Sequence, residues 1–272
     1  KILDKKKNFK FHKFNISNSR IFDLLDSIKP DVIINLAAQA GVRHSLKNPY
    51  VYINSNVLGQ VNMLELAKNL KVDKFIYASS SSVYGGNKEM PFSIKQRVDN
   101  PISLYAATKK STELIAECYS HLFKIQCIGL RFFTVYGPWG RPDMATFIFT
   151  KNILENKTIQ IFNYGKMKRD FTYIDDIVQG ILGVLKIRKN FSHKIYNLGN
   201  SHPEVLLKFI GVIEKNLNLK AKKNLLPIQP GDVSETFADI SESKKDFNFS
   251  PKTKVSTGIP KFINWYKDYY KL

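Results

Sequence analysis

The sequence has only two cysteines among its 272 residues, Cys118 and Cys127, and it lacks a long apolar run. The two cysteines fall in patterns typical of a helix and a strand, which predicts buried thiols rather than a disulfide framework. No stretch of about 18 apolar residues occurs, so no membrane-spanning helix is expected. The basic start of the chain lacks the apolar segment of a secretory signal. Histidine and cysteine are nowhere spaced as metal ligands, and we therefore expect a cytoplasmic protein without a metal site.

Acidic residues are also few: 23 Asp and Glu stand against 42 Lys and Arg, which gives a net charge of +19. A charge of this sign suits a nucleic acid, an acidic membrane surface or a phosphate-bearing substrate. The lysines are spread along the chain, however, and no nucleic-acid-binding motif accompanies them. We interpret most of them as solvated surface and expect neither a nucleic-acid nor a membrane partner.

Strand-like and helix-like segments alternate in the first half of the chain, which predicts an α/β fold with a doubly wound parallel sheet. The expected strands cover 9–16, 31–38, 74–80 and 125–132, and the expected helices begin at Ser19, Pro49 and Tyr105. Beyond Gly137, glycines and prolines divide the chain into shorter elements at 158–162, 175–188, 194–198 and 204–217, followed by a closing helix. We expect residues 1–135 to form a dinucleotide-binding domain to which 170–200 return, and 136–272 to form mainly a smaller, mixed substrate lobe.

Small and hydroxylated residues follow three of these predicted strands: Ala37-Ala38-Gln39, Ser80-Ser81-Ser82 and Phe133-Thr134. In a doubly wound fold, ligands bind at the carboxyl ends of the strands. The three segments therefore predict one site at this edge of the sheet.

Tyr105 and Lys109 lie four residues apart at the start of a predicted helix, so they share one face. A positive charge beside a phenol lowers its pKa from about 10, and a nearby serine hydroxyl relays a proton. The pattern predicts a site that removes a proton from an alcohol. The pairs Tyr84/Lys88 and Tyr164/Lys168 have the same spacing, but glycines in both windows indicate turns, in which such side chains do not stack.

A glycine-rich turn after a first strand, and an acidic residue after a second, are both absent from the sequence. The chain therefore reads as a Rossmann-type domain that begins near its third strand. We expect a segment of about 30 residues or more to be missing at the amino end. A catalytically inactive remnant that only binds a ligand or a partner is thus one alternative.

Several longer motifs resemble the extended short-chain dehydrogenase/reductases that act on nucleotide sugars. These are LAAQAGVR at 36–43, SSSSVYG at 79–85 and YAATK at 105–109. More specific are LRFFTVYGPWGRPDMA at 130–145, RDFTYIDD at 169–176 and QPGDV at 229–233, which are similar to bacterial UDP-glucuronate 4-epimerases of capsule and lipopolysaccharide synthesis.

The resemblance implies that Tyr105 takes the proton of the sugar 4-hydroxyl while a hydride passes from carbon 4 to NAD+ and later returns to the other face. Lys109 would hold the ribose, and Ser80, assisted by Ser81 and Ser82, would supply the hydroxyl. The cofactor-binding positions implied are Asn15, Ile16, Leu36, Ala37, Ala38, Gln39, Asn56, Tyr105, Lys109 and Phe133.

The substrate-binding positions implied are Thr134, Arg141, Arg169, Gln229 and Asp232. An arginine grips a carboxylate with two parallel hydrogen bonds, which suits the uronate group. Two alternatives stand beside these roles: Arg141 as a plain surface charge, and Arg169 paired with Asp170, Asp175 or Asp176.

Other activities of the same fold remain as alternatives. Ser81 and Ser82 stand where a dehydratase needs an acidic pair, which argues against dehydration. A UDP-glucuronate decarboxylase and a 4-epimerase of another UDP-sugar share the oxidation step and stay open. The helices at Pro49 and Tyr105 offer a face suited to a homodimer.

Overall fold

A four-stranded sheet lies at the centre of the computed structural model, which describes residues 3–22, 28–188, 191–229 and 232–272. All its pairings are parallel, in the order β1-β2-β3-β8. The strands are β1 (Val32–Asn35), β2 (Lys74–Ser80), β3 (Gln126–Phe132) and β8 (His193–Leu198). Most residues of β2 and β3 are buried, as expected for strands covered on both faces. The predicted parallel α/β fold is confirmed.

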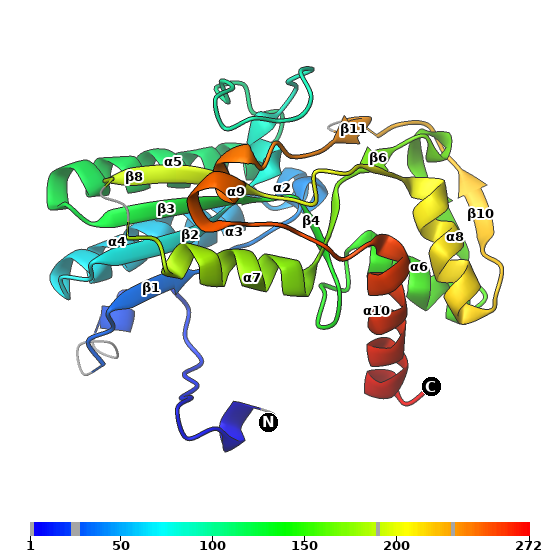
Figure 1. Ribbon diagram of the computed structural model, residues 1–272, viewed down its shortest axis with the longest axis horizontal. Coiled ribbons are helices and arrows are strands. Elements are labelled where there is room, and N and C mark those ends of the chain that lie inside the picture. The colour runs from blue at the N-terminus through cyan, green and yellow to red at the C-terminus, as the bar shows by residue number, and fades with distance from the viewer. Residues whose placement is uncertain (1–2, 23–27, 189–190, 230–231) are drawn as a thin grey trace.

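Helices cover both faces of this sheet (Figure 1). Because side chains alternate along a strand, Phe75 and Tyr77 of β2 pack with the helices on one face, and Ile76 packs on the other. The first face carries α4 (Gly59–Asn69) and α5 (Leu104–Phe123). The second carries α7 (Ile174–Leu185) and α9 (Ser241–Phe247).

The helix predicted to open at Pro49 is confirmed, with a change of winding inside it. It runs through α3 (Pro49–Tyr52), the π-helical η2 (Ile53–Leu58) and then α4. A π turn shifts the facing of the residues that follow and often occurs at functional sites. The short α2 (Val42–Lys47), which precedes it, was not predicted.

The strand predicted at 9–16 is wrong. Within the described residues this segment joins no sheet, and Phe11 is 69% exposed. Alternating apolar residues stabilise a strand only when a neighbouring strand accepts its hydrogen bonds and a core covers one face. The helix predicted from Ser19 falls largely on residues 23–27, which lie outside the described residues.

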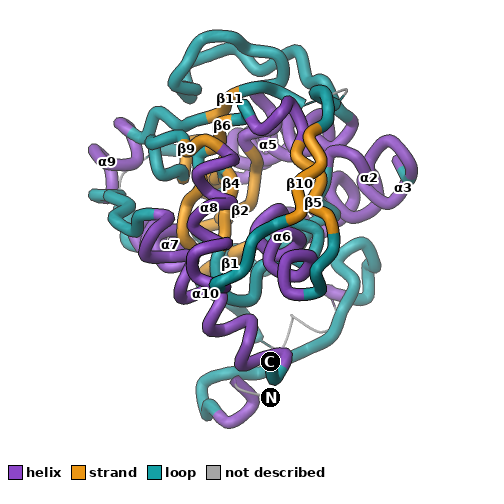
Figure 2. The backbone as a smooth tube through the Cα atoms, turned by 90° about the vertical axis from the view of Figure 1, so that its right-hand side faces the viewer, coloured by secondary structure: helices purple, strands orange, loops and turns teal. Residues whose placement is uncertain are grey.

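A second, mixed lobe follows the sheet (Figure 2). Its helices are α6 (Ala145–Leu154), α8 (Leu206–Leu217) and α10 (Val255–Tyr270), packed around stacked rings of Phe171 and Phe209, whose centroids are 3.9 Å apart. Its short strands are β4 (Thr134–Tyr136) with β7 (Phe171–Tyr173), β5 (Thr158–Ile161) with β10 (Lys222–Leu225), and β6 (Lys168–Arg169) between β9 (Glu204–Val205) and β11 (Glu235–Thr236).

Most of the shorter elements match their predictions. β5, α7, β8, α8 and α10 lie where the sequence predicted them, within a few residues. Cys127 is buried as predicted, but Cys118 is exposed, because it lies on the outer face of α5. Among the described helices, none has the length and apolarity that a membrane span requires.

Candidate active site

Two capped helix starts place the serines and Tyr105 at the same edge of the sheet. Ser80 ends β2, and its Oγ accepts a hydrogen bond of 3.1 Å from the Ser82 N–H at the start of η3 (Ser81–Tyr84). Ser103 Oγ accepts from the Ala106 N–H at 3.1 Å and caps α5. Tyr105 thus stands in the first turn of α5, close enough to Ser80 for the serine hydroxyl to favour its charged form and lower its pKa.

The other two pairs with a spacing of four, Tyr84/Lys88 and Tyr164/Lys168, occupy turns, as predicted. Tyr84 ends η3, and Gly85 follows it with φ +57°. Tyr164 itself has φ +51° within a turn. Only a helical spacing of four stacks two side chains, so the geometry singles out Tyr105 and Lys109 among the three pairs.

Lys109 follows Tyr105 by about one turn of α5, and it is 4% exposed. Its Nζ donates to the Ala78 carbonyl oxygen of β2 at 2.8 Å. Burial disfavours the charged ammonium and lowers the Lys109 pKa to about 8. Lys109 is therefore held against the strand rather than against the phenol.

The pKa of Tyr105 is raised, contrary to the predicted lowering. Burial disfavours the phenolate and is the largest cause. The hydrogen bond from Ser80 and the charge of Arg141 oppose it only in part. Lys109, which we predicted to lower this pKa, contributes to neither side, because its ammonium faces Ala78.

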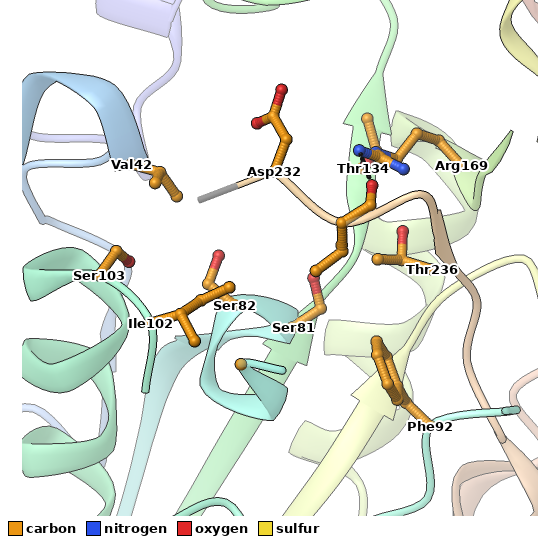
Figure 3. A pocket seen from close by; sticks show the side chains of 12 residues that line it. Val42, Ser81, Ser82, Phe92, Ile102, Ser103, Thr134, Arg169, Asp232 and Thr236 are labelled. Carbon is orange, nitrogen blue, oxygen red and sulfur yellow. Dashed lines mark hydrogen bonds between the residues drawn. The ribbon is translucent and has the colours of Figure 1, made fainter. Parts of the chain in front are cut away.

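Two adjoining cavities lie next to the serine turn and the start of α5. The smaller, of about 190 Å³, lies between η3, α5, β4 and the segment around Asp232 (Figure 3). Ser81, Ser82, Thr134, Arg169 and Asp232 line it. The larger, of about 790 Å³, shares Thr134, Arg169 and Asp232 and adds Arg141. The structure thus brings these predicted residues to one place.

A buried asparagine fixes the segment that follows β1. Asn56 of η2 accepts from the Gln39 N–H at 2.8 Å and donates to the Gln39 carbonyl oxygen at 3.0 Å. It also donates to Thr108 Oγ1 of α5 at 3.0 Å. Leu36, Ala37 and Ala38, between β1 and Gln39, are exposed at the strand end.

Three predicted cofactor positions remain, Asn15, Ile16 and Phe133. Asn15 Oδ1 accepts from the N–H and the hydroxyl of Ser17. Ile16 packs on Gly59 of α4, where an added Cβ would come within 2.7 Å of its side chain. Phe133 is buried beside Tyr84 at a ring distance of 6.3 Å.

The arginines of the substrate side differ in their partners. Arg141 is bound by Asp143 with hydrogen bonds of 2.9 and 2.5 Å, and its side chain is 45% exposed. Arg169 donates to the carbonyl oxygens of Lys168, Val233 and Ser234. The alternative in which Arg169 pairs with nearby acids is wrong.

Asp170 explains why that pairing fails. It is fully buried and accepts from the N–H groups of Asn200, Ser201 and Ala238. Its carboxylate therefore faces the interior, whereas the guanidinium of Arg169 faces the cavity.

Gln229 stands apart from the other predicted substrate-binding residues, Thr134, Arg141, Arg169 and Asp232, which line the cavities. Its carbonyl oxygen accepts from the Asp232 N–H at 3.1 Å. As far as the structure describes the lining of the two cavities, Gln229 is not part of it.

Sequence reasoning missed Arg43, which lines the larger cavity from α2. Its Nη2 lies 3.0 Å from Asp232 Oδ2, and its guanidinium lies 4.4 Å from the ring centroid of Phe162. The signal was its place at the end of the LAAQAGVR motif, directly after a strand end. Among the described residues, no group of His, Cys, Asp and Glu forms a metal cluster.

Comparison with known proteins agrees with this geometry. Protein MJ1055 of Methanocaldococcus jannaschii is 53% identical over 97% of the chain and 81% of its own length. UDP-glucuronate 4-epimerase 2 of Arabidopsis thaliana is 48% identical over 88% of the chain and 59% of its own length. The structure of UDP-glucuronic acid 4-epimerase from Bacillus cereus, in complex with UDP-glucuronic acid and NAD, superposes with a TM-score of 0.92. It is 36% identical, and the match covers 99% of this chain and 85% of that one.

The family model of NAD dependent epimerases and dehydratases matches residues 2–199, which is most of the chain. The resemblance to nucleotide-sugar epimerases noted from the motifs is confirmed. The chain belongs to the NAD dependent epimerase/dehydratase family.

Proposed function

We propose that the protein interconverts UDP-glucuronate and UDP-galacturonate by epimerisation at carbon 4, with NAD as cofactor. The observation that carries this proposal is the placement of Tyr105, in the first turn of α5, within reach of Ser80 and one helical turn from the buried Lys109, next to a cavity lined by Ser81, Ser82 and Thr134. Relatives that share this fold over nearly the whole chain are UDP-glucuronate 4-epimerases, which supports the choice of substrate.

The residues at the sheet edge suit a dinucleotide. Lys109 Nζ has three donors, and one described carbonyl uses one of them, so ribose hydroxyls can accept from the others. The exposed Leu36, Ala37 and Ala38 and the Gln39 segment held by Asn56 would line its nicotinamide half. Asn15, Ile16 and Phe133 complete the proposed positions. When bound, NAD+ supplies a hydride acceptor and a positive charge beside Tyr105.

Tyr105 acts in this proposal as the base for the sugar 4-hydroxyl. Burial raises its pKa, so the phenolate needs support from groups that prefer it charged. Ser80 supplies one such hydrogen bond, and Ser81 and Ser82 present hydroxyls in the adjoining cavity. The proton returns from Tyr105 when the hydrogen is restored to the other face of carbon 4, so the reaction has no net redox change.

The cavity offers arginines for the two anionic parts of the substrate. Arg141 would exchange Asp143 for the uronate carboxylate, which it can grip with two parallel hydrogen bonds. Restraint of that carboxylate matters because a 4-keto uronate is a β-keto acid and loses carbon dioxide readily. Arg169 would face the diphosphate, with Thr134 at the sugar and Gln229 and Asp232 at the nucleoside.

The test is to incubate the purified protein with UDP-glucuronate and NAD+ and to identify the product by NMR. The proposal predicts UDP-galacturonate. A UDP-pentose with carbon dioxide identifies a decarboxylase, and turnover of UDP-glucose alone identifies another 4-epimerase. Binding of the UDP-sugar without any turnover identifies the inactive remnant.

A variant tests the role of Tyr105. Tyr105→Phe removes the base but keeps the ring, so kcat should fall by about 10³-fold or more while the Kd for UDP-glucuronate changes little. Tyr164→Phe is the matched control, because Tyr164 has the same spacing to a lysine but lies exposed in a turn. Turnover by Tyr105→Phe that matches the control contradicts the assignment.

A further inference from the structure

A buried polar row crosses the sheet one residue before the strand ends. Ser79 of β2 is in register with Arg131 of β3, which is in register with Asn197 of β8. Register partners in a parallel sheet point to the same face. All three residues are at most 3% exposed, so this row forms a polar layer directly below the candidate active site.

Glu113 of α5 contacts this polar row from the helix side of the sheet. Its carboxylate accepts from Arg131 Nε and Nη2, both at 2.8 Å, and from Ser79 Oγ at 2.6 Å. Glu113 is 2% exposed. It follows Tyr105 and Lys109 at successive intervals of four residues, so the three side chains share one face of the helix.

The other end of the row fixes the turn that carries the serines. The Tyr84 hydroxyl, at the end of η3, donates to Asn197 Oδ1 at 2.7 Å. The Arg131 guanidinium lies 4.9 Å from the centroid of the Tyr84 ring. One connected network therefore joins β2, β3, β8, η3 and α5, and three of these elements carry Ser80, Ser82 and Tyr105.

Stability alone does not account for a buried ion pair of this kind. Removal of two charges from water is costly, and well-packed apolar residues in the same place are often as stable or more so. A bidentate guanidinium–carboxylate pair does, however, fix distance and direction between the elements that carry it. Burial alone raises the Glu113 pKa, yet the hydrogen bonds and charge of Arg131 lower it overall, so the pair is ionised.

We propose that Glu113 and Arg131 are positioning residues that set the height of α5 against the ends of β2 and β3. Their pair thereby places the Tyr105 hydroxyl against Ser80. The pair touches neither proposed substrate nor cofactor and acts through the helix. The inference deepens the proposed function and rests on it, because Tyr105 has its catalytic role only there.

The kinetic test removes both charges together, so that no uncompensated ion remains in the interior. Glu113→Leu combined with Arg131→Met should lower kcat by about 10- to 100-fold, since a displacement of about 1 Å costs rates of that order. The KM for UDP-glucuronate should change by less than about 3-fold, because Arg141 and Arg169 keep their places. Glu113→Asp keeps both charges and both carboxylate acceptors, so its kcat should fall less than that of the double variant.

A second ion pair provides the matched control. Lys194 of β8 lies 2.8 Å from Asp246 of α9, whose side chain is 2% exposed. It joins a helix to the same sheet but on the face opposite to α5. Lys194→Met combined with Asp246→Leu should leave kcat within about 2-fold of the unchanged protein.

A structural readout separates this inference from the proposed function. Crystal structures of the unchanged protein and of the Glu113→Leu/Arg131→Met variant should differ in the distance from Tyr105 Oη to Ser80 Oγ, which should be about 1 Å longer in the variant. An unchanged distance between these two atoms overturns the positioning role, as does an unchanged kcat. Absence of UDP-glucuronate turnover in the unchanged protein instead overturns the proposed function, and the two crystal structures still decide the positioning role.

Discussion

At the scale of a single residue, Lys109 carries a charge at a buried position that disfavours that charge. Its ammonium lies in the interior with one carbonyl partner among the described residues, and burial lowers its pKa to about 8. The ordinary value is 10.5, so the folded protein binds this proton more weakly than the unfolded chain does. The charged form of Lys109 therefore lowers the stability of the fold.

Lys109→Met should stabilise the protein while it abolishes turnover. At pH 7 the free energy of unfolding should rise by about 2 kcal/mol, less than the full cost of the pKa shift because the Ala78 carbonyl loses its donor. The gain should be greatest below pH 8 and should shrink as the pH rises from 8 to 10.5, where the folded protein already releases this proton. Urea unfolding at several pH values measures it.

The control for that variant is Lys74→Met, at the opposite end of β2. Lys74 Nζ donates to two carbonyl oxygens, those of Leu185 and Ile187, and lies far along the strand from Ser80. Burial also lowers the Lys74 pKa, but two carbonyl oxygens would lose their donor, so Lys74→Met should gain less stability than Lys109→Met and should keep its kcat. A Lys109→Met variant that is less stable at pH 7 than the unchanged protein contradicts the account of the buried ammonium.

At the scale of elements, the π-helical turn η2 matters because it presents Asn56 inward. Asn56 joins the segment after β1 to α5 through Gln39 and Thr108. That segment and α5 would hold the cofactor in the proposed function. One side chain thus sets the distance between two segments that are far apart in the sequence.

Asn56→Leu should weaken both the fold and cofactor binding. Loss of the amide leaves buried groups of Gln39 unpaired, which should lower the free energy of unfolding by about 2 kcal/mol. The Kd for NAD+, measured by calorimetry, should rise by about 10-fold. Asn216→Leu is the control, because the hydrogen bond of Asn216 among the described residues goes to the Val212 carbonyl oxygen of its own helix, α8. The Kd of this variant for NAD+ should stay unchanged. Equal Kd values in both variants exclude this role of Asn56.

The sequence predicted the elements whose signals are local. The buried strands β2 and β3 were read from apolar runs, and α5 from its helix formers and apolar face. Other elements gave no such signal. The helix α2 is only six residues long, and β10 is a strand of exposed residues, two of them lysines, that forms through its pairing with β5. The alternation of apolar and polar residues at 9–16 led to a wrong strand prediction, because a strand also needs a neighbouring strand to pair with.

The same distinction holds for the candidate site. Residues next to strand ends were predictable, since topology brings the ends of parallel strands to one edge. The Glu113–Arg131 pair and the contact of Arg43 with Asp232 were not, because they join positions far apart in the sequence. The raised Tyr105 pKa depends on burial, which no four-residue spacing reveals. The division into domains at residue 135 stays a prediction.

At the scale of the whole molecule, one exposed apolar face is unusual for a chain of such high charge. Leu114, Cys118 and Leu122 form an exposed stripe on α5 at intervals of four residues. Leu46 and Tyr50, on the neighbouring α2 and α3, are also exposed. Exposed apolar side chains on neighbouring helices favour association. The homodimer stays a prediction, and these helices are where we expect its interface.

Leu114→Glu combined with Leu122→Glu should convert the dimer to a monomer, because like charges would meet across the interface. Size-exclusion chromatography with light scattering gives the mass directly. Leu182→Glu, on the exposed side of α7, introduces the same charge elsewhere and should leave the dimer intact. A monomeric mass for the unchanged protein refutes the homodimer.

The most direct test of the whole account follows the hydrogen on carbon 4. UDP-glucuronate that carries deuterium at carbon 4 is converted by the protein in ordinary water, and the product is examined by NMR and mass spectrometry. The account predicts UDP-galacturonate that keeps the deuterium at carbon 4, because the hydrogen removed from one face is returned to the other without exchange. Replacement of the deuterium by solvent hydrogen, or its appearance in a UDP-pentose, contradicts the account.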